Sequence, residues 1–123
     1  ARTGKKLEFL ERALAPCHTL DVKRLAHAAV SGINSICDYL TATSYDSAVP
    51  ALKESLSAFE RWCDNLLIRR IRPQKYNPFT VAPLAAYLLA RENEIKIVRI
   101  ILSGKLNQLS DASVRERVRE TYV

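Results

Sequence analysis

Residues 83–104 read PLAAYLLARENEIKIVRIILSG. Apolar residues recur in this stretch at intervals of three and four, which is the spacing of one face of an α-helix. Pro83 fits the first turn of a helix, where its missing amide proton costs least, and Gly104 is a typical C-terminal stop. The stretch therefore predicts one long helix, and we expect its large apolar residues to form a buried stripe. These residues are Leu84, Tyr87, Leu88, Ile95, Val98, Ile101 and Leu102.

Two segments precede this helix. From Pro50 to Arg72, apolar residues again recur at threes and fours, which predicts a second long helix whose apolar stripe needs partner helices to cover it. The segment from Gln74 to Val81 is too rich in proline for regular structure. We expect an ordered crossover loop there, with Tyr76 and Phe79 turned inward.

Shorter helices are predicted in the first third of the chain. An opening helix is marked by Leu7, Leu10 and Leu14, and Asp21 is suited to cap a second one. Gly32 loosens or ends that second helix. The following residues, 33–40, again have helical spacing, and the pattern leaves open whether they continue the second helix or form a new one.

The pattern as a whole predicts an all-α protein. A last helix is capped by Ser110, and its segment Arg115 to Arg119 alternates with glutamates, as expected of an exposed face. No segment shows the sustained alternation of a half-buried strand. We expect a compact bundle of about five or six helices in a single domain, residues 1–123. Because the chain begins at Ala1 and contains no methionine, we expect a C-terminal fragment of a larger subunit.

The chain is basic, with a net charge of +6 and a pI near 9.5. Such a charge invites the hypothesis of a nucleic-acid-binding or regulatory module. However, 13 acidic residues are interleaved with the 19 basic ones, and no glycine-rich loop, stacking aromatic pair or zinc-finger spacing accompanies the charge. No window holds the ~18 to 20 apolar residues that span a bilayer.

Catalytic and metal-binding patterns are hard to find. Cys17, Cys37 and Cys63 match neither a redox pair nor a zinc quartet. Glu92 and Glu94 are two residues apart, so on a helix they point in different directions. Neither Gly-Lys pair has the flanking residues of a phosphate-binding loop. The residues alone therefore predict an all-α interaction domain with no catalytic residues, cofactor or metal.

Several segments carry a resemblance to a known family. The string from Tyr87 to Leu109, YLLARENEIKIVRIILSGKLNQL, resembles the closing signature of the C subunit of A/V-type ATP synthases, called the d subunit in eukaryotic V-ATPases. The helix from Phe59 to Leu67, FERWCDNLL, is similar to the Phe-Glu-x-x-x-Asp-Asn-x-Leu helix of that family. The ending from Val114 to Val123 is similar to the family's natural C-terminus. The first half matches in helical character and at Ser35 to Leu40.

The resemblance implies a specific function. Family members are wholly helical, funnel-shaped subunits built of three similar lobes, of which this chain would be one. Such a subunit sits on the cytoplasmic face of the membrane as a peripheral protein and joins the central axle to the rotor ring that translocates protons or sodium. The resemblance thus implies a non-catalytic central-stalk subunit with no cofactor and no small-molecule substrate, whose partners are the axle subunits and the ring.

Two groups of charged residues are the candidates for a partner interface. The first lies in the matched signature and consists of Glu92, Glu94 and Arg99. The second lies at the end of the Pro50 to Arg72 helix and consists of Arg69, Arg70, Arg72 and Lys75. The alternative for the first group is an ion pair within the domain, and the alternative for the second is a solvated helix end, where cations complement the helix dipole.

Two other classes of function stay open on the residues alone. A nucleic-acid-binding or regulatory module would show an affinity that falls steeply with salt. An enzyme assembled from distant residues would show a deep pocket that holds acids of perturbed pKa or a paired cysteine and histidine.

Overall fold

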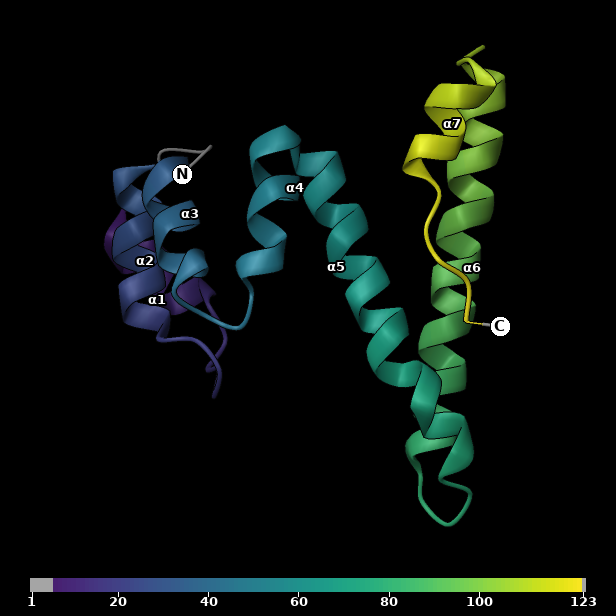
Figure 1. Cartoon of the computed structure of the whole chain (residues 1–123), viewed down its shortest axis with the longest axis horizontal. Coiled ribbons are helices and arrows are strands. Elements are labelled where there is room, and N and C mark those ends of the chain that lie inside the picture. Colours follow the sequence, from purple (N-terminus) through teal and green to yellow (C-terminus); the bar gives the residue numbers. More distant parts are fainter. Residues whose placement is uncertain (1–5, 123) are drawn as a thin grey trace. The chain divides into compact units, whose positions relative to one another are not determined.

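The computed structural model describes residues 6–122 and forms two compact units, residues 1–55 and 56–123, each of which is described by itself (Figure 1). Within the described residues the secondary structure is entirely helical, with seven α-helices and two short 3₁₀ helices. The all-α prediction is confirmed, with one or two α-helices more than expected. The extent of a single domain over residues 1–123 stays a prediction. Among residues 6–122, no helix combines the length and the apolar character needed to cross a bilayer.

The first unit consists of short helices joined by tight turns. Its elements are α1 (Leu7–Ala13), α2 (Val22–Ser31), α3 (Ile33–Thr41), the 3₁₀ helix η1 (Asp46–Ala48) and α4 (Val49–Glu54). Its most deeply buried residues are small, with Ala26, Cys37 and Ala48 at most 2% exposed. Helices of this length depend on packing rather than on intrinsic propensity.

Local sequence signals explain the helix boundaries of this unit. The Asp21 side chain accepts hydrogen bonds from the backbone N–H groups of Lys23 and Arg24, so the predicted cap of α2 is confirmed. Gly32 has φ 129°, a conformation open to glycine, and it separates α2 from α3. Residues 33–41 therefore form a helix of their own. Pro50 lies in the first turn of α4, as predicted.

The helix predicted from Pro50 to Arg72 is interrupted. Ser55 adopts an extended conformation with φ −168° and ψ 162°, so α4 ends at Glu54 and a new helix begins at Leu56. The apolar spacing continues across this break, and the periodicity alone did not reveal it.

The second unit contains the two long helices. Its elements are α5 (Leu56–Ile71), the 3₁₀ helix η2 (Arg72–Tyr76), α6 (Ala82–Leu106) and α7 (Asp111–Arg117). Ser110 caps α7 by accepting a hydrogen bond from the N–H of Ser113, as predicted. Beyond α7 the backbone turns extended at Val118 (φ −67°, ψ 144°). We call residues 118–122 the C-terminal strap (Figure 1).

The buried face of α6 is built from small and polar residues. Ala86, Ala90, Asn93 and Gly104 are the residues of this helix that are buried. Ala86 and Ala90 form a core cluster with Ile68 and Ile71 of α5, and small side chains allow this close approach.

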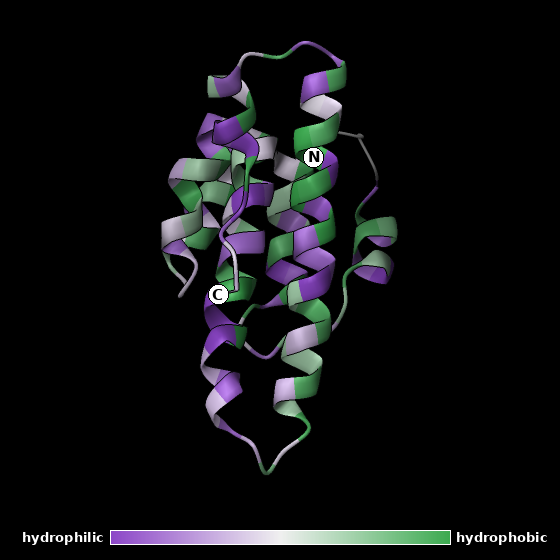
Figure 2. Ribbon diagram, turned by 90° about the vertical axis from the view of Figure 1, so that its right-hand side faces the viewer, coloured by the Kyte–Doolittle hydropathy of each residue, from purple (hydrophilic) through white to green (hydrophobic). Residues whose placement is uncertain are grey.

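Most of the large apolar residues of α6 are exposed, although Leu89 packs on the core cluster. Leu84 is 71% exposed, Leu88 61%, Ile95 50% and Leu102 56%. The predicted buried stripe is therefore wrong for this unit, because helical spacing identifies residues that share a face but not which face is covered. Figure 2 shows hydrophobic residues along the whole α6 ribbon.

The crossover segment differs from the prediction in two respects. Residues 74–76 belong to the 3₁₀ helix η2, so the segment is not wholly without regular structure. Its aromatic residues Tyr76 and Phe79 are 76% and 99% exposed, so they are not turned inward.

Gly104 does not end α6, which continues to Leu106. It is buried against α7, and a Cβ atom built on it would lie 2.6 Å from Cγ2 of Val114. The lack of a side chain, rather than a capping role, explains a glycine at this position.

We predict that Gly104→Ala destabilises the chain by about 1–3 kcal/mol, because the added methyl group meets a stiff β-branched side chain. The measurement is the free energy of urea unfolding. Val114→Ala supplies the control, since the double variant should lose much less than the sum of the two single losses. Additive losses would contradict the close contact.

Candidate functional site

Polar side chains of α5 and α6 hold the backbone of the C-terminal strap. The N–H of Glu120 donates to Oδ1 of Asn65 over 2.8 Å, and the carbonyl of Glu120 accepts from Nδ2 of Asn93 over 2.9 Å. Asn93 is 6% exposed, so this amide is buried where a missing hydrogen bond is costly. One residue of the strap is thus bound on both sides of its backbone, by one asparagine from each long helix.

Asp64 supports the same arrangement from one position earlier on α5. Its carboxylate receives Nε of Arg119 at 3.0 Å and Nζ of Lys96 at 2.8 Å. The Arg119 side chain is only 9% exposed. Burial raises the pKa of Asp64, but the hydrogen bonds and charges of Lys96 and Arg119 outweigh it, and the net effect lowers the pKa. The carboxylate is therefore charged and links α5, α6 and the strap.

Two further arginines, Arg69 in the last turn of α5 and Arg72 at the start of η2, complete the contacts. Arg69 forms an ion pair with Glu120, and its hydrogen bond and charge lower the pKa of that carboxyl group. Arg72 donates from Nη2 to the carbonyl of Thr121 over 2.6 Å. The Nε atom of Arg72 is buried and has no hydrogen-bond partner among the described residues. Tyr122 then packs on the core cluster that includes Ile68.

The structure thus divides the second group of predicted interface residues. Arg69 and Arg72 contact the strap of their own chain, as described above. Arg70 is exposed, and Nζ of Lys75 lies 5.2 Å from the centre of the Tyr76 ring. The four cations therefore do not form one continuous free patch. Whether any of them contacts a partner stays a prediction.

The first predicted group lies on or beside the outer face of α6. Glu92 and Arg99 are exposed, and Glu94 forms an ion pair with Arg91 one turn earlier. Glu94 and Arg99 also border a shallow hollow of about 340 Å³, together with Ile95 and Val98. The structure places these charges beside the exposed apolar residues, and their contact with a partner stays a prediction.

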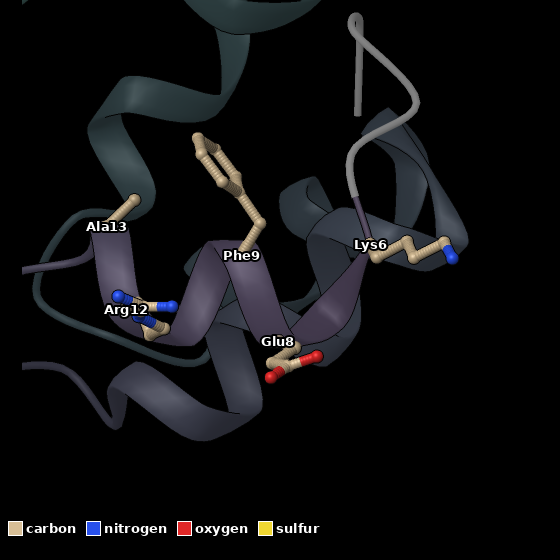
Figure 3. A pocket seen from close by; sticks show the side chains of 5 residues that line it. All are labelled: Lys6, Glu8, Phe9, Arg12 and Ala13. Atoms are coloured by element: carbon tan, nitrogen blue, oxygen red, sulfur yellow. The ribbon is translucent and has the colours of Figure 1, made fainter.

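The hollows of the structure offer little chemistry. One of about 650 Å³ lies along α1 and is lined by Lys6, Glu8, Phe9, Arg12 and Ala13, with a single carboxylate and no histidine or cysteine (Figure 3). Among residues 6–122, no three histidine, cysteine or acidic side chains are grouped as a metal site requires. Burial, followed by the charges of Asp64 and Glu60, raises the pKa of the Cys63 thiol, which disfavours a reactive thiolate.

The sequence prediction missed the residues that bind the strap. They are Asp64, Asn65 and Asn93, and the strap residues Arg119 and Glu120, which these residues bind, were missed as well. A signal was present in α5, where adjacent Asp and Asn residues lie between the apolar residues of the helix. Arg119 was instead predicted to lie on an exposed face. What the pattern did not reveal is that the chain turns back after α7 to reach them.

Within residues 6–122 the regular secondary structure is wholly helical, and the buried polar groups described above hold the chain's own backbone. The family model for the ATP synthase (C/AC39) subunit matches residues 1–117, and the chain belongs to this family. The C subunit of the A-type ATP synthase of Thermococcus kodakarensis is 25% identical over 122 residues, which are 95% of this chain and 33% of that protein. The chain thus spans about a third of the length of this curated relative. No solved structure matches it significantly.

We predict that Asn93→Ala destabilises the chain by about 1–3 kcal/mol, because the carbonyl of Glu120 loses the donor that the buried Asn93 supplies. Urea unfolding followed by circular dichroism measures the change. Glu92→Ala, on the exposed side of the same helix, is the matched control and should stay within about 0.5 kcal/mol of the wild type. Equal effects of the two substitutions would contradict the role of Asn93.

A pH dependence follows from Asp64. Since its pKa is lowered in the folded chain, its contribution is present above the unfolded pKa of about 3.9 and is lost as the pH falls through the folded value. The stability difference between wild type and Asp64→Asn should therefore be largest near neutral pH and should shrink in acid. Unfolding curves from about pH 7 down to about pH 2 measure it. A difference that is independent of pH would show that the carboxylate charge does not matter.

Proposed function

We propose that this chain is part of a non-catalytic central-stalk subunit of a rotary A/V-type ATP synthase, which couples the rotor axle to the ion-translocating ring of the membrane. The observation that carries the proposal is the family match over residues 1–117. The curated relative, named as a C subunit of an A-type ATP synthase, agrees with it. In this proposal the subunit is peripheral and lies at the cytoplasmic face of the membrane. It transmits torque by contact and contributes no catalytic residue.

The outer face of α6 is the surface that we assign to the axle. A helix that is apolar on both sides is normally buried on both sides, and the contacts with α5 and the strap account for only one of them. The exposed side carries Leu84, Leu88, Ile95, Val98 and Leu102, each at least half exposed. An apolar patch of this length marks an interaction surface.

The charges beside this face suit such a contact. Arg91, Glu92 and Arg99 are all exposed and are of both signs. Charged groups at the rim of an apolar interface fix its register and exclude wrong partners more than they add affinity. A coupling element needs that property, because torque is lost if the two surfaces slip.

The alternative function, a basic module that binds nucleic acid, is less well supported. It depends on the net charge of +6 and on the basic run at the end of α5. Two arginines of that run, Arg69 and Arg72, are directed to the strap, and Arg119 is paired with Asp64. The remaining cations are interleaved with acids, which is a weak footprint for phosphate binding.

The proposal predicts that the full-length parent subunit is captured by purified axle subunits and that substitutions on the outer face of α6 weaken the capture. Leu88→Asp combined with Ile95→Asp places two charges in the apolar stripe and should lower the affinity by about tenfold or more. Glu92, Glu94 and Arg99 changed together to alanine should weaken capture and make it less dependent on salt. A pull-down with the ring and the axle in separate arms measures both.

The control for this experiment is Arg115→Ala with Arg117→Ala on α7, which removes exposed charges and should leave capture unchanged. Circular dichroism must show an intact helical fold for every variant. Capture of neither the wild type nor the variants by axle or ring would contradict the stalk function. Equal capture of all forms would place the interface elsewhere on the subunit.

A further inference from the structure

Beside the core cluster, side chains of α5, η2 and α6 bind the C-terminal strap, and we call the surface formed by Asp64, Asn65, Arg69, Arg72 and Asn93 the groove. We propose that this groove is a recognition site for an extended peptide and that the strap is its built-in, exchangeable occupant. The proposal is independent of the central-stalk function. The occupant to which it commits is the chain's own segment Val118 to Tyr122, whether it comes from the same molecule or from a second copy.

The first argument is that the groove binds backbone. Asn65 accepts from the N–H of Glu120, and Asn93 donates to the carbonyl of the same residue, at 2.8 and 2.9 Å. Arg72 donates to the next carbonyl, that of Thr121, at 2.6 Å. A groove that satisfies the backbone of an extended segment with fixed side chains uses the chemistry by which proteins bind peptide ligands.

The second argument is that the groove also distinguishes side chains. The Asp64 carboxylate forms an ion pair with the Arg119 guanidinium, and Arg69 forms an ion pair with the Glu120 carboxylate. Tyr122 packs beside the core cluster of α5 and α6. The groove therefore selects a basic residue at position 119, an acidic residue at position 120 and an aromatic residue at position 122. Reversal of the first two charges would place like charges together at both positions.

The third argument is that the strap is able to leave without breaking a helix. Extended backbone follows α7 from Val118 onward, and the helical hydrogen bonds of α5 and α6 are made within each helix. The Arg69 and Glu120 side chains are 59% and 33% exposed, so water reaches the outer edge of the contact. The inner contacts, through Asn93 and Arg119, are buried, so we expect local opening of the strap to begin at this outer edge, below the free energy of global unfolding.

The experiment uses the full chain with Glu120→Pro, which removes the N–H that Asn65 binds and leaves every groove residue intact. The probe is a fluorescein-labelled peptide with the wild-type sequence from Arg115 to Tyr122, followed by fluorescence anisotropy. We expect it to bind this variant about tenfold or more tightly than it binds the wild type, whose own strap competes. Adding Asn65→Leu in the groove should weaken binding about tenfold.

The matched control is a peptide of the same composition and net charge in which Arg119 and Glu120 exchange places. Binding of the control about tenfold weaker than the wild-type peptide would support the proposed specificity. Equal binding of the two peptides, or binding of neither to a variant that keeps its helical circular dichroism, would overturn the proposal.

A second measurement uses the unmodified chain, in case Glu120→Pro does not fold. Hydrogen exchange of the Glu120 amide is compared with that of the Ala90 amide in the core. An exchangeable strap predicts exchange of Glu120 about tenfold or more faster than Ala90, through local opening. Equal rates for the two amides would show that the strap leaves only when the chain unfolds, and would overturn the proposal.

Discussion

The packing of the second unit depends on the hydrogen bonds that two asparagines make to the backbone of Glu120. Asn65 of α5 and Asn93 of α6 bind the N–H and the carbonyl of that one residue, so the strap joins the two helices beyond their shared core cluster. If the buried side-chain amide of Asn93 had no hydrogen-bond partner, the fold would be destabilised. The strap is therefore favoured in the one position where Glu120 supplies that partner. Asp64 of α5 also links the strap to both helices, because its carboxylate pairs with Arg119 of the strap and with Lys96 of α6.

This arrangement decides which residues of α6 face inward. The strap and the close helix contacts require small or polar side chains, and Ala86, Ala90, Asn93 and Gly104 supply them. Apart from Leu89, which packs on the core cluster, and the half-buried Ile97 and Ile100, the large apolar residues of α6 lie on the outer side, where they are exposed. In the proposed function, this exposed apolar area is the contact surface for a neighbouring subunit of the assembly.

The sequence predicted the helices well and the covered faces poorly. Local signals sufficed for the cap at Asp21, the break at Gly32 and the start at Pro83, because each acts within a few residues. The burial of Gly104 depends on a tertiary contact with α7. The sequence predicts part of the candidate site, because Arg69 and Arg72 are among the predicted interface residues. Their contacts with the strap could not be predicted, because the strap is about 50 residues later in the chain and helical periodicity reports only local structure.

The central claim is that the inner face of α6 is occupied by the strap and that its outer face meets another subunit. Hydroxyl-radical footprinting of the full-length protein, alone and assembled with the axle, tests both parts at once. The account predicts that Leu88, Ile95 and Leu102 are labelled in the isolated protein and become protected on assembly, whereas Tyr122 has the same labelling in both states. Labelling of the three α6 residues that does not change on assembly, or protection already complete in the isolated protein, would contradict it.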